Sequence, residues 1–182
     1  MRFAYADPPY LGCAARYADR HPNAMIWDDP KTHQGLIERL CEEFPDGWAM
    51  SLISPTLKTI LPMCPDDCRI GAWVKPFCSY KPGVSVAYAW EPVIFRGGRK
   101  RPKYEGPGKG RDTWNVRDWV SSVITLKRNT PGAKPDAFCW WIFDLLGMKP
   151  EDEFVDLFPG SGAVGRAWNL YCRADRDCPL WA

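Results

Sequence analysis

Short apolar segments alternate with helical segments along most of the chain, and this alternation is the feature that most constrains the fold. The predicted strands are Met1–Ala6, Trp48–Ile53, Arg69–Val74, Ser85–Phe95, Glu153–Leu157 and Leu170–Ala174. The predicted helices are about Asp29–Phe44, a short stretch after Ser54-Pro55, Pro135–Leu146 and about Ala163–Asn169. Strands that alternate with helices predict an α/β fold, in which a mostly parallel sheet is covered on both faces. The segment Arg117–Ile124 fits neither pattern.

The length and composition fit one domain without disulfides or a metal. The chain has 182 residues, enough to bury a core, and its eight cysteines form no dense framework, so we expect reduced thiols. Cys64 and Cys68 could be half of a zinc site, but there are only two histidines and no second tight cysteine pair. No apolar run approaches the roughly 20 residues of a membrane span. No signal peptide is recognisable. We therefore predict a cytoplasmic protein without a membrane contact.

Positive charge is concentrated in one glycine-rich segment. Between Arg96 and Arg117 lie eight basic and two acidic side chains, a net charge of +6, whereas the whole chain carries +2 and the remainder is −4. A charge run is often only a solvated face, but this concentration favours contact with a polyanion. We predict that residues 96–118 form a nucleic-acid-binding insert within a single domain, 1–182. The predicted contact residues are Arg96, Arg99, Lys100, Arg101, Lys103, Lys109 and Arg111.

The first predicted strand ends in the tetrapeptide D-P-P-Y. Pro8 and Pro9 cannot extend a strand in a sheet interior, so they form a rigid turn that holds Asp7 and Tyr10 in fixed directions. In open α/β sheets such strand ends are where ligands bind. An ordinary loop that only stops the strand is the alternative.

A later strand ends in a second motif, F-V-D-L-F-P-G-S-G-A-V-G-R-A-W, from Phe154 to Trp168. Glycines after a strand let the backbone approach a ligand and leave the N–H groups of the next helix free. The pattern differs from the G-x-G-x-x-G fingerprint of dinucleotide-binding folds, and it lacks the G-K-[ST] of a P-loop.

Together the two motifs resemble those of S-adenosylmethionine-dependent amino-methyltransferases, which modify the exocyclic nitrogen of adenine or cytosine in DNA. Here D-P-P-Y comes first, the basic segment second and the glycine motif last. That order resembles the circularly permuted β group, which is common in restriction–modification systems and phages. The segment Asn129–Gly147 resembles the Lys-Pro helix that precedes the glycine motif in this group. The resemblance covers nearly the whole chain and implies a minimal, three-layer, Rossmann-like methyltransferase sheet.

The resemblance implies that Asp7, Pro8, Pro9 and Tyr10 are the catalytic residues. Asp7 and the carbonyl of Pro8 would accept the two N–H bonds of the target amine, and Tyr10 would stack on a base that has left the duplex. The methyl group would move by direct displacement, without a covalent intermediate, so positioning and electrostatics would supply most of the catalysis. Aspartate in the first place favours N6 of adenine in DNA.

The resemblance also implies a binding site for S-adenosylmethionine. The glycine motif would form its bed, and Lys134-Pro135 would flank its methionine end. Asp175, 19 residues after Asp156, would bind the ribose hydroxyls, with Asp177 as the competing candidate. The implied cofactor-binding residues are Ala6, Asp7, Lys134, Pro135, Asp156, Phe158, Pro159, Gly160, Ser161, Gly162 and Asp175.

Three other functions stay open. The messenger-RNA adenosine methyltransferases have a D-P-P-W variant, and Trp73–Arg99 resembles their Trp-Lys…Glu…Arg-Gly stretch, although Tyr10 stands in place of tryptophan. A DNA cytosine-N4 methyltransferase is the second, and a catalytically silent nucleic-acid-binding module is the third. The chain is short for this group, so one sheet edge could be exposed, and a second copy or a partner subunit could cover it.

Overall fold

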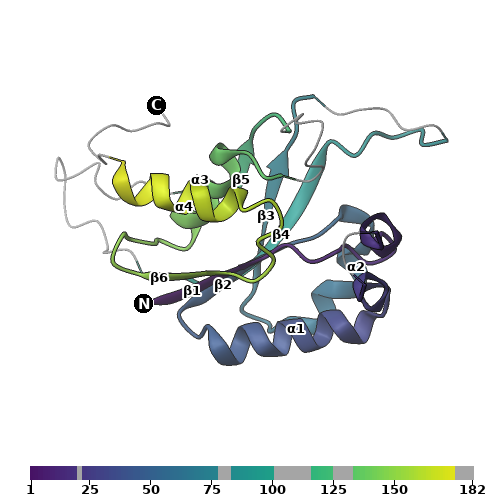
Figure 1. The fold of residues 1–182 in the computed structure, drawn as a ribbon, viewed down its shortest axis with the longest axis horizontal. Coiled ribbons are helices and arrows are strands. Elements are labelled where there is room, and N and C mark those ends of the chain that lie inside the picture. The colour runs from purple at the N-terminus through teal and green to yellow at the C-terminus, as the bar shows by residue number, and fades with distance from the viewer. Residues whose placement is uncertain (20–21, 78–82, 101–115, 125–132, 175–182) are drawn as a thin grey trace.

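A computed structural model describes residues 1–19, 22–77, 83–100, 116–124 and 133–174, which form one six-stranded sheet with helices on both faces (Figure 1). The strand order is β5-β3-β4-β2-β1-β6. The strands are β1 (Arg2–Ala6), β2 (Gly47–Ser51), β3 (Arg69–Val74), β4 (Trp90–Gly97), β5 (Trp119–Ser121) and β6 (Glu153–Asp156). Among these described strands, β4 alone is antiparallel to its neighbours, so the prediction of a mostly parallel sheet is confirmed.

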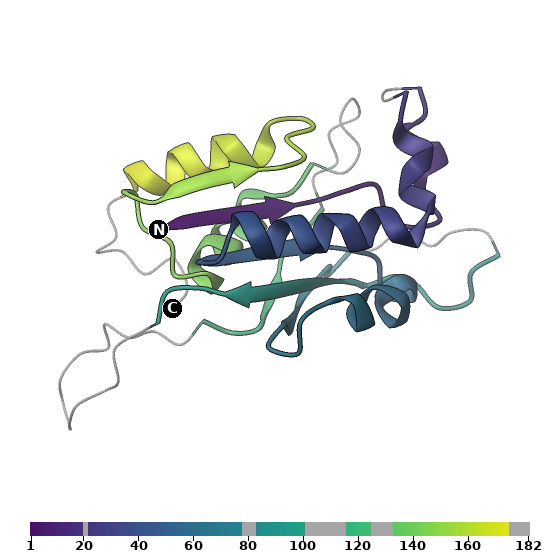
Figure 2. The same ribbon diagram turned by 90° about the horizontal axis from the view of Figure 1, so that it is seen from below.

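Two layers of helices enclose the sheet (Figures 1 and 2). One face is covered by α1 (Pro30–Glu43) and the short α2 (Leu57–Ile60), and the other by α3 (Asp136–Leu145) and α4 (Ala163–Arg173). Short 3-10 helices lie at Ala14–Tyr17, Ala24–Asp28, Ser54–Thr56 and Leu61–Met63. The predicted three-layer arrangement is therefore confirmed.

The strand β1 lies between β2 and β6 and contributes side chains to the core on each face of the sheet. Successive side chains of a strand point to opposite faces. Phe3 and Tyr5 therefore belong to the core under α3 and α4, whereas Ala4 and Ala6 belong to the core over α1. All four are fully buried. A strand buried on both faces has a continuous apolar sequence, which is why the first segment of the chain predicted β1 correctly.

The helices are positioned by local contacts at their ends and by close packing. The side chain of Asp29 accepts the N–H of Lys31, so it caps α1. On the opposite face, Trp141 of α3 lies directly over Gly71 of β3. A Cβ at Gly71 would lie 2.9 Å from the Trp141 ring, so only glycine lets α3 pack this closely. The Trp141 indole also donates to the carbonyl of Arg117 at 2.8 Å.

Two predicted strands differ clearly from the structure, and one observed strand was not predicted. The strand predicted at Leu170–Ala174 is wrong, because this segment is the end of α4 and its cap. Buried residues at Val164, Ala167 and Tyr171 recur at helical spacing and belong to the core shared with α3, so the helix continues. The strand predicted to begin at Ser85 begins at Trp90, and β5 lies within the segment that fitted neither pattern.

Within the described residues, we find no helix whose length and apolar character would let it cross a membrane.

Candidate active site

The two sequence motifs lie side by side at the carboxyl edge of the sheet, the edge formed by the carboxyl ends of β1, β2 and β6. β1 and β6 are parallel neighbours, and Tyr5 pairs with Asp156. The chain therefore leaves β1 at Asp7 beside the point where it leaves β6. Lys134 reaches the same edge from the segment that precedes α3. The carboxyl ends of parallel strands are the usual ligand-binding edge of open α/β sheets.

Asp7 and Lys134 form an ion pair at this edge. Nζ of Lys134 lies 3.0 Å from Oδ1 of Asp7 and donates a 3.0 Å hydrogen bond to the Tyr10 hydroxyl. The Lys134 side chain is only 6% exposed. Burial alone lowers the pKa of the Lys134 ammonium, but the negative charges of Asp7 and Glu91 outweigh it, and the pKa is raised. Lys134 is therefore a charged donor at neutral pH.

The Tyr10 hydroxyl lies between two carboxylates. It is 3.1 Å from Oδ1 of Asp7 and 3.1 Å from Oε2 of Glu91, and its single proton can be donated to one of them at a time. Burial, together with the charges of Asp7 and Glu91, raises the pKa of Tyr10 well above its usual range. Tyr10 is therefore neutral, and its hydroxyl fixes the position of its ring.

Glu91 and Lys75 complete a charged cluster, which we define as Asp7, Lys134, Glu91 and Lys75. Lys75 directly follows β3, and its Nζ contacts Oε1 of Glu91 in β4. Nζ of Lys134 lies 3.7 Å from Oε2 of Glu91. Burial alone raises the pKa of Glu91, but the charges of Lys134 and Lys75 outweigh it, and the pKa is lowered.

Sequence reasoning did not predict Glu91 or Lys75 as site residues. Both residues lie within Trp73–Arg99, the segment that resembles a stretch of the RNA enzymes. A usable signal was present, because Glu91 interrupts the apolar strand W-E-P-V-I-F. A charge that enters a buried strand needs a partner of opposite charge.

Asp156 at the end of β6 has an unsatisfied oxygen. Its Oδ1 accepts the N–H of Phe158 at 3.2 Å, whereas Oδ2 is buried and has no hydrogen-bond partner among the described residues. Burial is the main cause that raises the pKa of Asp156 to about 6, and the charge of Asp7 adds to the effect. A buried acceptor without a donor is costly, so this oxygen favours a ligand that brings one.

The turn after Asp156 depends on glycine. Gly160 and Gly162 have φ angles of 45° and 70°, in the left-handed region that side chains rarely adopt. A Cβ at Gly160 would meet only the Phe158 carbonyl oxygen, at 3.7 Å, so the conformation and not the available space requires glycine. Gly162 is the N-cap residue of α4. The first N–H groups of a helix have no partner within it, so those of α4 face this turn.

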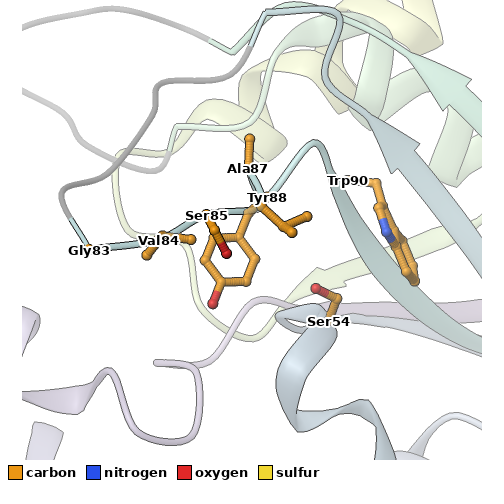
Figure 3. A pocket seen from close by; sticks show the side chains of 8 residues that line it. Ser54, Gly83, Val84, Ser85, Ala87, Tyr88 and Trp90 are labelled. Carbon is orange, nitrogen blue, oxygen red and sulfur yellow. The ribbon is translucent and has the colours of Figure 1, made fainter.

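A cavity of about 440 Å³ opens at the carboxyl edge of the sheet (Figure 3). It is lined by Ser54 after β2, residues 83–88 and Trp90 at the start of β4. Trp90 and Glu91 are successive residues of β4, so their side chains point to opposite faces of the sheet, and no member of the cluster is among the residues that line the cavity. Tyr88 and Trp90 are 37% and 39% exposed, and both rings line the cavity. Aromatic rings at an open cavity are suited to stacking on a flat ligand.

The first residues of the basic segment lie at the opposite, amino edge of the sheet. Gly97 pairs with Gly47 at the start of β2. Arg99 donates to both oxygens of Asp152, at 2.7 and 2.8 Å, and to the carbonyl of Gly147 at 3.1 Å. Asp152 also accepts from the N-terminal ammonium at 2.9 Å. These contacts show that Arg99 helps to hold the fold.

The other predicted site residues fall into four groups. Arg96 pairs with Asp67 at 2.7 Å, and Lys100 is exposed. Ala6 is buried at the end of β1, and Pro135 is the N-cap residue of α3. The residues Arg101, Lys103, Lys109, Arg111, Asp175 and Asp177 lie outside the described residues. The remaining members, Pro8, Pro9, Pro159 and Ser161, belong to the turns after β1 and β6.

Comparison with solved structures shows proteins of similar fold, including M1.HpyAVI and TTHA0409. No protein-family model and no curated protein sequence matches the chain. The chain is similar to M1.HpyAVI in complex with SAM, with a TM-score of 0.52 and 18% identity over 94% of this chain and 78% of that chain. M1.HpyAVI in a second structure gives 0.50 and 17%, over 94% and 76%. TTHA0409 of Thermus thermophilus, described as a candidate DNA modification methylase, gives 0.52 and 16%, over 94% and 77%. These likenesses confirm the predicted α/β, Rossmann-like fold.

Proposed function

We propose that the protein is an S-adenosylmethionine-dependent DNA methyltransferase that acts on the N6 amine of adenine. The main support is the pair of carboxylates on neighbouring strands, Asp7 at the end of β1 and Asp156 at the end of β6. Asp7 suits a target amine, and Asp156, with its unpartnered oxygen, suits a cationic cofactor. The fold agrees with this proposal, because M1.HpyAVI was solved with SAM and TTHA0409 is described as a candidate DNA modification methylase.

The residues after β6 fit a cationic cofactor. A donor or a positive charge near Oδ2 of Asp156 would remove the cost of leaving this buried oxygen unpaired. The proposed bed consists of Asp156, Phe158 and the backbone at Gly160 and Gly162. When bound, S-adenosylmethionine supplies a methyl group on a positively charged sulfur. Lys134 contacts Asp7 and Tyr10, and we therefore assign it to the catalytic loop.

Asp7 keeps one oxygen for the target amine. Its Oδ1 accepts from Lys134 and Tyr10, whereas its Oδ2 has no hydrogen-bond partner among the described residues. We propose that Oδ2 and the carbonyl of Pro8 accept the two N–H bonds of the amine. The lone pair of an aromatic amine is delocalised into the ring, and holding both N–H bonds aims it out of the ring plane. Positioning of this kind, with preorganised charges, would supply most of the catalysis.

The nucleic acid is proposed to approach the carboxyl edge. An extruded base needs a pocket with aromatic faces, and Tyr88 and Trp90 line a cavity together with Ser54, which follows β2 at this edge. Lys100 and the basic residues outside the described part stay predicted phosphate contacts, whereas Arg99 is assigned to the fold. A homodimer or a partner subunit stays a prediction, as does a restriction–modification or phage origin.

The proposal is tested with purified protein and S-adenosylmethionine that carries an isotopic label on its methyl group. Duplex DNA, single-stranded DNA and RNA are offered separately, each product is digested, and the labelled nucleoside is identified. We expect N6-methyladenine from DNA. Label in N4-methylcytosine would change the target base, label only in RNA would change the substrate, and absence of both label and cofactor binding would contradict the proposal.

A further inference from the structure

We propose that Glu91 is a positioning residue that balances the charge of the cluster, so that Asp7 stays available to the amine and the cationic cofactor binds better than its uncharged product. The inference rests on the proposed function. Glu91 touches neither Asp7 nor the turn after β6 in the described contacts, and it acts through Lys134 and Tyr10.

The cluster places its charges in alternation. Lys134 lies between two carboxylates, 3.0 Å from Asp7 and 3.7 Å from Glu91, and Glu91 in turn contacts Lys75. The side chains of Glu91 and Lys75 are 16% and 13% exposed. Two negative and two positive groups give a net charge of zero. Charges with so little access to water depend on such partners.

Loss of the Glu91 charge would leave Lys134 with Asp7 as its one ion-pair partner among the described residues. The Lys134 ammonium is too buried for water to replace the lost carboxylate, so its full charge would act on Asp7. The cluster would then carry a net charge of +1. Tyr10 would also lose one of its two carboxylate acceptors, which would loosen the position of its ring.

The sulfur of the cofactor distinguishes substrate from product by charge. Reacting atoms must lie about 3 Å apart, so the cationic sulfur of S-adenosylmethionine has to lie close to the amine that Asp7 holds. The product, S-adenosylhomocysteine, has nearly the same shape but an uncharged sulfur. A unit of positive charge on the cluster would repel the cationic sulfur. At an effective dielectric constant of about 20, such repulsion is enough to weaken binding of S-adenosylmethionine roughly tenfold, with little effect on S-adenosylhomocysteine.

The test compares the affinities of the full chain for S-adenosylmethionine and S-adenosylhomocysteine by isothermal titration. For Glu91→Gln we expect the Kd of S-adenosylmethionine to rise about tenfold, with little change for the product. The double variant Glu91→Gln/Lys134→Met restores a net charge of zero, so the ratio of the two affinities should return toward the wild-type ratio. Glu38→Gln, an exposed change of the same chemistry on α1, is the matched control and should leave both affinities unchanged.

Lys75→Gln provides an independent arm, because it gives the cluster a net charge of −1 and should shift the ratio in the opposite direction. If Glu91→Gln does not fold, the ratio measured in Lys75→Gln alone tests whether the charge of the cluster controls cofactor binding. Equal weakening of both ligands in Glu91→Gln, or an unchanged ratio in Lys75→Gln, would overturn the role of Glu91. A wild-type protein that binds neither ligand would overturn the proposed function. A wild type that binds and transfers, with ratios unchanged in the variants, would overturn the inference alone.

Discussion

Two ion clusters at opposite ends of β1 differ in how fully their carboxylates are satisfied. At the amino edge, Asp152 accepts from the N-terminal ammonium, from Arg99 through both oxygens and from the N–H of Lys149, and its side chain is 1% exposed. At the carboxyl edge, Oδ2 of Asp156 is buried without a partner, and Oδ2 of Asp7 accepts no hydrogen bond among the described residues. A closed cluster stabilises the fold, whereas open acceptors indicate a place for ligands.

The largest effect on the difference between the two edges is expected when the carboxylate of Asp7 is removed. Asp7→Ala should lower the rate of methyl transfer by roughly 10³-fold, because the amine loses the acceptor that orients it. Binding of S-adenosylmethionine should stay largely intact. The measurement is single-turnover transfer to DNA, with cofactor affinity as the control. Equal activity in wild type and variant would exclude the proposed mechanism.

The second prediction concerns the amino edge. Asp152→Asn should lower the free energy of unfolding by about 2 kcal/mol, because it leaves Arg99 and the N-terminal ammonium without their shared carboxylate. Both cations are partly exposed, which limits the loss. Urea denaturation measures the effect. The rate of transfer per folded molecule should stay near the wild-type rate, and a loss of rate as large as that in Asp7→Ala would contradict the division between the two edges.

The same residue should make stability depend on pH. Burial by itself raises the pKa of Asp152, but its hydrogen bonds and charges, Arg99 first, outweigh it and the pKa is lowered. A depressed folded-state pKa stabilises the protein above the unfolded value, near 4, and this contribution is lost as the pH falls through the folded value. Asp152→Asn should remove that part of the acid dependence.

The third prediction concerns Asp156, whose pKa lies at about 6. Because a cationic ligand favours the ionised carboxylate, affinity for S-adenosylmethionine should fall about tenfold between pH 7 and pH 5. Asp156→Asn should bind more weakly at pH 7 and lose this dependence. The effect of Asp156 on the stability of the fold is opposite to that of Asp152. Because its folded-state pKa is raised, the ionised Asp156 lowers the free energy of unfolding above pH 6. This loss disappears as the pH falls below the unfolded pKa, near 4. Titration calorimetry across this range checks the binding claim, and a flat profile in wild type would contradict it.

The smallest expected effect concerns DNA binding by the basic segment. Arg99→Met should leave the dependence of DNA affinity on salt unchanged, because its guanidinium is bound to Asp152. Lys100→Met is the matched control at an exposed neighbour, and it should reduce the salt slope by about one if Lys100 contacts a phosphate. A reduced slope in Arg99→Met alone would reverse these assignments.

Much of the fold could be predicted because its signals are local. The limits of β3 were predicted without error, and the predicted start of α1 at about Asp29 lies one residue before its observed start at Pro30. The error at Leu170–Ala174 has a physical cause: periodicity does not distinguish helix from strand in so short an apolar run. Burial of Tyr171 in the core shared with α3 decides the question, and that contact is not local.

The candidate site could be predicted only in part for the same reason. Asp7 and Tyr10 are three residues apart and form a recognisable motif, and the resemblance pointed to Lys134. The ion pair between Lys134 and Asp7 joins residues far apart in the chain, so no local pattern predicts it. Glu91 and Lys75 meet only because β3 and β4 pair in one register, with Trp73 opposite Glu91.

The most direct test of the account is one assay on three proteins: wild type, Asp7→Ala and Asp152→Asn. Transfer of labelled methyl to DNA is measured at a temperature where all three are folded, and the labelled nucleoside is identified. The account predicts N6-methyladenine from wild type and from Asp152→Asn, and none above background from Asp7→Ala. Label retained in Asp7→Ala, or no nucleic acid labelled by a wild type that is folded and binds S-adenosylmethionine, would contradict the claim that the carboxyl edge is the active site.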